Sequence, residues 1–174
     1  MSIPVYNFEE QLKIGKKGEE IMGKYHAPFY IVTKTLLAQD KQGIDFIFTS
    51  YSTEYPWKVE VKTDQKSQDT GNLFMETISK DTTNKQGWAE TSQCEVFIQY
   101  RWYADEVMYF WMKDIKNNID EWVNKYRVVP TQNEGWKTWG VLLPLKKARE
   151  FTFATRSPIN HEWIERNYKT WSNQ

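Results

Sequence analysis

Apolar residues recur at helical spacing near the start of the chain, over residues 7–26. One face of this segment carries apolar or small residues at i, i+4, i+7 and i+11: Ile14, Gly18, Ile21 and Tyr25. Asn7 is suited to cap the segment, because its side chain can accept hydrogen bonds from the first free backbone amides. The pattern predicts a helix that ends before Pro28, since proline cannot continue it.

Alternation at period two follows the helix, in stretches rich in β-branched and aromatic residues. Strands are predicted over 29–35, 44–51, 57–63, 72–79, 95–101, 106–112 and 139–143. Residues 80–88 are expected as a polar turn, and helices or helical turns over 114–126 (with Asp114 as its N-cap), 144–150 and 158–171. This order predicts an α/β (α+β) fold with a central mixed β-sheet flanked by helices, in one domain over residues 1–174.

Composition is typical of a folded protein of this size. Nine tryptophans and an aromatic content of 16% in 174 residues exceed what a disordered chain carries, and the length suffices for one well-buried core. The 23 basic and 23 acidic residues give a formal net charge of zero. This excludes the strongly basic balance of a general nucleic-acid binder, although a local basic patch is still compatible with it.

Cys94 is the only cysteine, so neither an intrachain disulfide nor a cysteine-based zinc site is expected. The first residues lack the basic start and apolar run of a signal peptide. No apolar stretch approaches the roughly 20 residues needed to cross a bilayer. We therefore expect an intracellular, cytoplasmic protein without a membrane partner.

The chemistry-bearing pattern lies on the second and third expected strands. Glu60 and Lys62 are two residues apart, so they share one face of the strand at a separation of roughly 6.5–7 Å. Asp45 begins the preceding strand and reaches the same place if the two strands pair. Two carboxylates and a lysine suit phosphodiester hydrolysis, which needs a hard cation, an activated water and positive charge against the transition state.

At these positions the chain resembles the PD-(D/E)XK nuclease superfamily, which includes restriction endonuclease-like and Holliday junction resolvase-like proteins. The resemblance rests on GID at 43–45, EVK at 60–62 after 14 intervening residues, and GKKGEE at 15–20 on the first helix. It implies an α-β-β-β-α-β core over about 8–101, with a C-terminal extension over 102–174. Two departures are visible: Ile44 replaces a nominal proline, and 72–79 is expected as a strand where the family has a helix. That helix could instead be short and lie around 87–93.

The resemblance implies a role for each matching residue. Asp45 and Glu60 would bind Mg²⁺, or Mn²⁺ in its place, and Lys62 would be the catalytic lysine. Glu19 would complete the acidic cluster and is favoured over Glu20, because it lies beside the apolar face of the helix. The implied activity is that of a metal-dependent DNA nuclease, an endonuclease in the first instance. Its implied substrate is duplex or branched DNA, and the resemblance is also compatible with a homodimer.

A phosphate-binding surface could include Lys16, Lys17, Gln65 and Lys66, although each is equally compatible with an ordinary solvated side chain. Two other functions stay open. One is a catalytically inactive DNA- or protein-binding module on the same fold. The other is an aromatic-rich domain that binds carbohydrate or single strands, which would gather exposed tryptophans on one face. Trp88, Trp136 and Trp139 are the tryptophans expected to be exposed.

Overall fold

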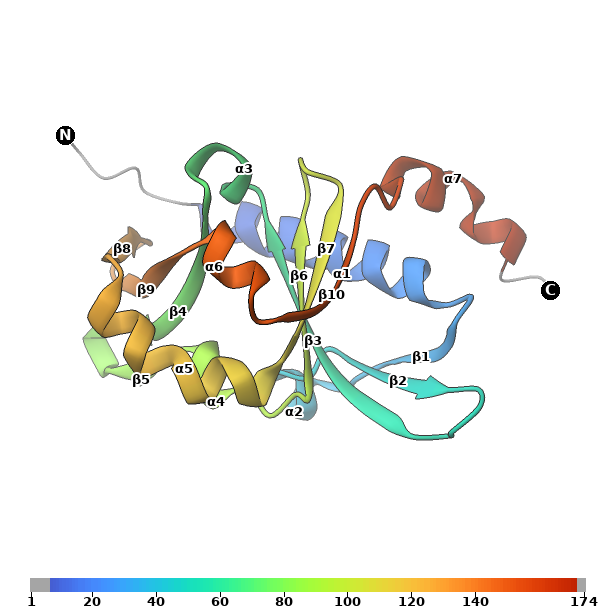
Figure 1. The fold of residues 1–174 in the computed structure, drawn as a ribbon, viewed down its shortest axis with the longest axis horizontal. Helices are drawn as coiled ribbons and strands as arrows, with labels where there is room; N and C mark the ends of the chain where they lie inside the picture. The colour runs from blue at the N-terminus through green and yellow to red at the C-terminus, as the bar shows by residue number, and fades with distance from the viewer. Residues whose placement is uncertain (1–6, 172–174) are drawn as a thin grey trace.

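The computed structural model describes residues 7–171, which form two β-sheets with helices packed against them (Figure 1). The central sheet has six strands in the order β1-β2-β3-β6-β7-β10: β1 (Tyr30–Lys34), β2 (Phe46–Ser50), β3 (Pro56–Asp64), β6 (Val96–Arg101), β7 (Glu106–Trp111) and β10 (Thr152–Arg156). The second sheet has four in the order β5-β4-β9-β8: β4 (Asn72–Lys80), β5 (Lys85–Gln86), β8 (Val128–Gln132) and β9 (Lys137–Pro144). The helical segments are α1 (Phe8–His26), α2 (Leu37–Asp40), α3 (Ser67–Thr70), η1 (Asp81–Thr83), α4 (Trp88–Thr91), α5 (Met112–Lys125), α6 (Leu145–Arg149) and α7 (His161–Trp171).

The central sheet is mixed, as predicted. Strands β1, β2 and β3 form an antiparallel meander, whereas β6 runs parallel to β3 and pairs Val59 with Val96. A parallel pair needs a crossover connection. Here the crossover is the chain from α3 to α4, which contributes β4 and β5 to the second sheet on its way.

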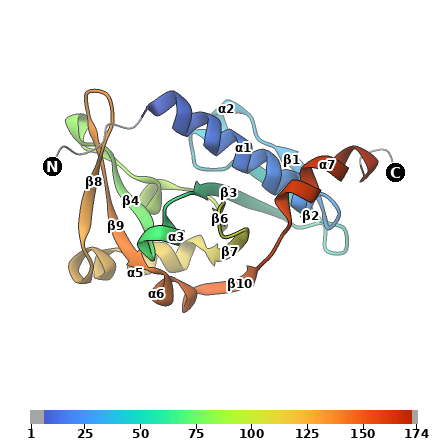
Figure 2. The ribbon, with the colours of Figure 1, turned by 90° about the horizontal axis from the view of Figure 1, so that it is seen from above.

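Helix α1 begins where the sequence predicts. The side chain of Asn7 accepts hydrogen bonds from the backbone amides of Glu9 (3.0 Å) and Glu10 (3.3 Å), which satisfies two of the free donors at a helix start. Ile21 and Met22 are fully buried where the helix packs on the sheet. Figure 2 shows α1 and α5 on opposite sides of β3, β6 and β7, so helices flank both faces of the central sheet.

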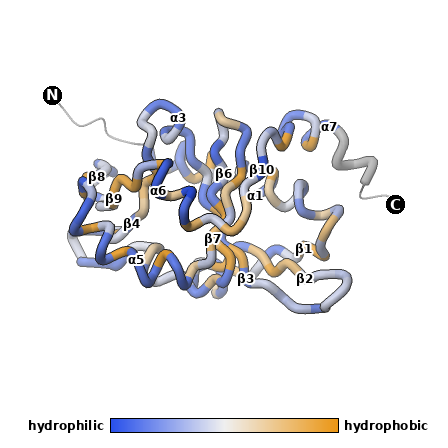
Figure 3. The backbone as a smooth tube through the Cα atoms, viewed as in Figure 1, coloured by the Kyte–Doolittle hydropathy of each residue, from blue (hydrophilic) through white to orange (hydrophobic). Residues whose placement is uncertain are grey.

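Two apolar clusters fill the two sides of the central sheet. The cluster on the α1 side includes Val59, Val61 and Ile98, and the cluster on the α5 side includes Phe97 and Trp122. The most hydrophobic backbone segments gather at the centre of the molecule, where β3, β6 and β7 run side by side (Figure 3). Because successive strand residues point to opposite faces, Glu60 and Lys62 face the side opposite to Val59 and Val61.

The structure departs from the expected elements at several places. Strands β5, β8 and β10 and the short helical segments α2, α3 and η1 were not predicted, and there are two sheets where one was expected. Helix α5 begins two residues early, with Trp111 as its N-cap and Asp114 inside its first turn. Helix α7 begins at His161 rather than at 158.

The segment expected as a C-terminal extension, 102–174, is part of the central fold. It supplies β7 and β10 to the central sheet and β8 and β9 to the second sheet. Phe110 and Trp122, both from this segment, are fully buried. No helix among residues 7–171 is both long enough and apolar enough to span a membrane.

Candidate functional site

Asp45 stands directly before β2 and is fixed onto the backbone of β3. Its amide donates to the carbonyl of Val59 (2.8 Å), and its Oδ2 accepts a hydrogen bond from the amide of Val61 (2.7 Å). Thr35 adds two hydrogen bonds to the carbonyl of Asp45, from its amide and from its hydroxyl, each 3.0 Å long. Only 4% of the residue is exposed, so these contacts leave the carboxylate little freedom.

Glu60 and Lys62 lie next to this carboxylate on β3. The Nζ of Lys62 is 2.7 Å from Oε1 of Glu60. Glu60 is only 2% exposed, and its other oxygen, Oε2, is buried without a hydrogen-bond partner. The Lys62 side chain is 39% exposed, so the lysine forms the solvent-facing side of the cluster and Glu60 its floor.

The charges of the cluster act strongly on one another. Burial raises the pKa of Asp45 to about 7, although the Lys62 ammonium and the hydrogen bond from Val61 both act to lower it. Burial acts to lower the pKa of Lys62, but the carboxylates of Glu60 and Asp45 outweigh that effect and raise it. Asp45 therefore gains its charge near neutral pH, beside a lysine that keeps its own.

A tight turn closes the cluster from the side of α4. Gly43 has a φ of +72°, and a Cβ at this position would lie 2.9 Å from Oε2 of Glu60 and 2.7 Å from the hydroxyl of Ser92. That hydroxyl donates to the carbonyl of Gly43 (3.0 Å) and accepts from the amide of Cys94 (3.3 Å). Both the backbone conformation and the space require glycine here.

Cys94 is a buried free thiol beside the same turn. Burial raises its pKa to about 12, although a hydrogen bond with Ser92 acts in the opposite direction. At neutral pH the side chain is therefore a neutral thiol, which is a much weaker nucleophile than a thiolate.

Helix α1 packs very closely on β3 and brings Glu19 within electrostatic range of Asp45. A Cβ on Gly18 would lie 1.7 Å from the hydroxyl oxygen of Thr63. The Glu19 carboxylate acts to raise the pKa of Asp45, so it lies within electrostatic range, and it forms an ion pair with Lys34. The alternative, Glu20, is half exposed and pairs with Lys24 on the outer surface of the helix. Of the two glutamates, only Glu19 is among the groups that act on the pKa of Asp45.

The four residues suggested for DNA contact differ in their exposure and in their ion-pair partners. Lys16 and Lys66 are exposed, and Gln65 is half-buried. Lys17 forms ion pairs with Glu20 and with Glu165 of α7. Because acidic partners compensate its charge, Lys17 is the weakest of the four candidates.

Three residues of the site were missing from the sequence-based prediction. Lys34 pairs with Glu19 from the end of β1. Gln99 of β6 is in register with Lys62 and 4% exposed, and its Oε1 has no partner. Glu76 of β4 lies in the electrostatic range of Lys62 and Glu60; burial raises its pKa, and Lys62 acts to lower it. The alternation of 95–101 already placed Gln99 on one face, but only the register identifies Lys62 as its neighbour.

The donor set at this cluster fits a magnesium ion. No group of three or more histidine, cysteine, aspartate or glutamate side chains among residues 7–171 is arranged to hold a metal. Magnesium, however, is usually bound through one or two carboxylates, with water and substrate phosphate completing its shell. Asp45 and Glu60 supply two carboxylates, and the unpartnered Oε2 of Glu60 is an available oxygen ligand.

Comparison with known proteins gives no relative of this chain: no family model matches it, and neither a curated protein nor a solved structure is significantly similar to it.

Proposed function

We propose that this protein is a magnesium-dependent deoxyribonuclease of the PD-(D/E)XK type. The observation that carries the proposal is the convergence of Asp45, Glu60 and Lys62. Asp45 is held on the backbone of β3, and Lys62 contacts one oxygen of Glu60 while the other oxygen is buried and unpartnered. A buried polar group without a partner is costly, and a bound cation would remove that cost.

The strand order supports the same proposal. The sheet order β1-β2-β3-β6, with β6 parallel to β3, fits the α-β-β-β-α-β core that the resemblance implies. The strand expected over 72–79 forms β4, which remains a departure from that core, and a short helix, α4, lies within 87–93. Relative to that core, β4 and β5 are an insertion in the crossover before β6.

Each residue has a distinct role in the proposed reaction. Asp45 and Glu60 would hold the magnesium ion, which supplies Lewis-acid activation of phosphate and water when bound. Lys62, at the exposed side, would donate hydrogen bonds to the scissile phosphate and offset its growing negative charge. Glu19 would complete the acidic cluster from α1 once its ion pair with Lys34 is broken.

Cleavage of supercoiled, linear, branched and single-stranded DNA, with Mg²⁺ or with EDTA, tests the proposal. We expect cleavage only with Mg²⁺, and a loss of about a hundredfold or more in Lys62→Ala and Asp45→Asn. Lys113→Ala, on the exposed surface of α5, is the matched control and should keep full activity.

Unchanged cleavage by Lys62→Ala would refute the assignment of the catalytic lysine. If the wild type binds DNA but cleaves none of the substrates with Mg²⁺ or Mn²⁺, the chain is instead a binding module on this fold. Circular dichroism of each variant shows whether a lost activity reflects lost chemistry or lost structure.

A further inference from the structure

An aromatic groove, lined by side chains from all six strands of the central sheet and from the end of α1, lies on the other face of this sheet from Glu60. Its volume is about 480 Å³, within the usual range of ligand sites. Of its fourteen lining residues, all in the described part of the chain, nine carry a ring, four are aliphatic and one is charged. This face of β3 presents Trp57 and Val59, so the groove is separate from the carboxylate cluster.

The rings form an open platform. Trp111 and Phe153 stack with their centroids 4.3 Å apart and their planes at 23°, and Trp57 lies 5.5 Å from Trp111. Phe153 is 45% exposed and Phe29 61% exposed. Both line the same groove, and a gathering of exposed aromatic side chains indicates a surface that contacts a ligand or partner.

The groove carries one positive charge and no negative one. Its charged lining residue is Arg156, whose guanidinium donates to the carbonyl of Thr155 (3.0 Å). No carboxylate of residues 7–171 forms an ion pair with it. His26 is neutral, because burial lowers its pKa to about 4, although the hydrogen bond with the carbonyl of Met22 acts to raise it.

These features select among the ligands that aromatic sites take. A cationic ligand is disfavoured by Arg156, although bare aromatic faces would attract it. A carbohydrate needs carboxylate or amide groups for its hydroxyls, and the lining has none. A nucleotide fits both features, since its base stacks on aromatic rings and its phosphate pairs with arginine.

We propose that the aromatic groove binds unpaired nucleotides of single-stranded nucleic acid, with bases stacked on Trp57, Trp111 and Phe153 and a phosphate held by Arg156. Paired bases in a duplex are stacked on each other and do not offer their faces. The groove therefore distinguishes single strands from duplex. This binding needs neither the metal nor cleavage.

Binding by the full-length protein in EDTA tests the proposal independently of any nuclease activity. The probes are oligomers of thymidine and of uridine about ten nucleotides long, and a duplex of the same length. We expect the single strands to quench tryptophan fluorescence and to bind at least about tenfold more tightly than the duplex. The two single strands decide between DNA and RNA as the preferred source.

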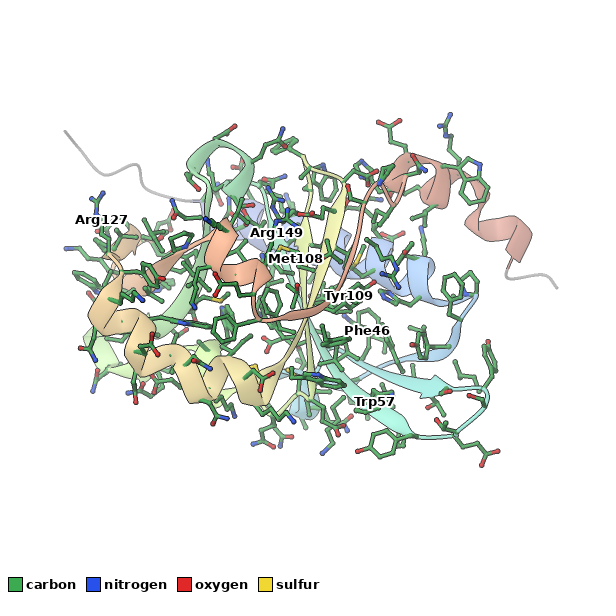
Figure 4. The ribbon with its side chains drawn as sticks, viewed as in Figure 1. Phe46, Trp57, Met108, Tyr109, Arg127 and Arg149 are labelled. Carbon is green, nitrogen blue, oxygen red and sulfur yellow. The ribbon has the colours of Figure 1, made fainter. Side chains whose placement is uncertain are left out.

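Variants at the rim of the groove locate the site. We expect Phe153→Ala to weaken single-strand binding about tenfold, and Arg156→Gln to reduce the slope of log affinity against log salt by about one. Two matched controls lie outside the groove and should bind as the wild type does. They are Tyr103→Ala, exposed in the turn between β6 and β7, and Arg127→Gln, exposed at the left edge of Figure 4, well away from Trp57 and Tyr109.

Three results would overturn the proposal. The first is equal affinity for duplex and single strand, and the second is wild-type binding by both Phe153→Ala and Arg156→Gln. The third is a dimer in sedimentation that Phe153→Ala dissociates and the oligomers do not, because the groove is then covered by a second copy of the chain.

Discussion

At the scale of single residues, Glu60 is the most deeply buried carboxylate of the site. It is almost completely buried, and only one of its two oxygens has a partner. An unsatisfied buried oxygen costs about 1–3 kcal/mol, and removing Lys62 would leave the whole carboxylate uncompensated. The site is therefore a place where the isolated protein gives up stability that a bound cation could restore.

Asp45 makes this cost dependent on pH. Its folded pKa of about 7 lies above its ordinary value of 3.8, so between these values the folded state retains a proton that the unfolded state has lost. Stability is therefore lost as pH rises through this window, by up to about 4 kcal/mol. We expect Asp45→Asn, measured by urea unfolding in EDTA, to be more stable than the wild type at pH 8, with the difference shrinking toward pH 4.

Magnesium provides the control for this experiment. At pH 8, Mg²⁺ should stabilise the wild type and have little effect on Asp45→Asn, because a ligand that binds only the folded state raises stability. A difference between the two proteins that stays constant from pH 4 to pH 8 would show that Asp45 does not carry the raised pKa.

At the scale of elements, the contact between α1 and β3 fixes how close Glu19 comes to Asp45. Gly18 lies directly against Thr63, whereas nothing approaches within 4 Å of a Cβ on Gly15. Glycine in a helix interior costs stability relative to alanine. The close approach of β3 accounts for the glycine at position 18, and no such approach accounts for the one at position 15.

The two glycines form a matched pair for mutation. Gly18→Ala should destabilise the protein by about 1–3 kcal/mol, since the new methyl group forces α1 away from β3. Gly15→Ala should stabilise it by up to about 1 kcal/mol through helix propensity alone. Thermal unfolding measures both, and Thr63→Ala should rescue part of the Gly18→Ala loss. Equal effects at the two positions would contradict the packing described here.

Local patterns predicted the elements that carry the candidate site, and longer-range pairing accounts for what they missed. The alternation in β3 placed Glu60 and Lys62 on one face, and the hairpin order brought Asp45 beside them. Strand β8 lacks a clear signal, because all five of its residues are half-buried. Lys34 and Gln99 could not be assigned either, since their partners depend on how separate elements meet.

At the scale of the whole molecule, the two sheets depend on segments far apart in sequence. Strand β4 pairs with β9, and β7 pairs with both β6 and β10. The predicted core over 8–101 therefore contains strands whose partners lie beyond it. The sequence predicted a single sheet, because the local pattern of β4 does not indicate which strands it pairs with.

Truncation tests this dependence. We expect a chain of residues 1–101 not to fold, because β6 loses its partner β7 and the cluster on the α5 side loses Phe110 and Trp122. A chain ending at Arg156 keeps every strand of both sheets and should fold with a lower Tm, having lost the buried Ile159 and Ile164. A cooperative thermal transition in the 1–101 chain, followed by near-ultraviolet circular dichroism, would contradict this expectation.

The buried thiol of Cys94 allows local opening of the site to be measured. The thiolate is the form that attacks alkylating reagents, so a thiol that is buried and hard to ionise reacts only when local opening exposes it. Cys94 is bonded through its amide to Ser92, which holds Gly43 beside Glu60. The rate of alkylation therefore reports how often this turn opens locally. Because the chain has one cysteine, this measurement needs no engineered cysteine or label.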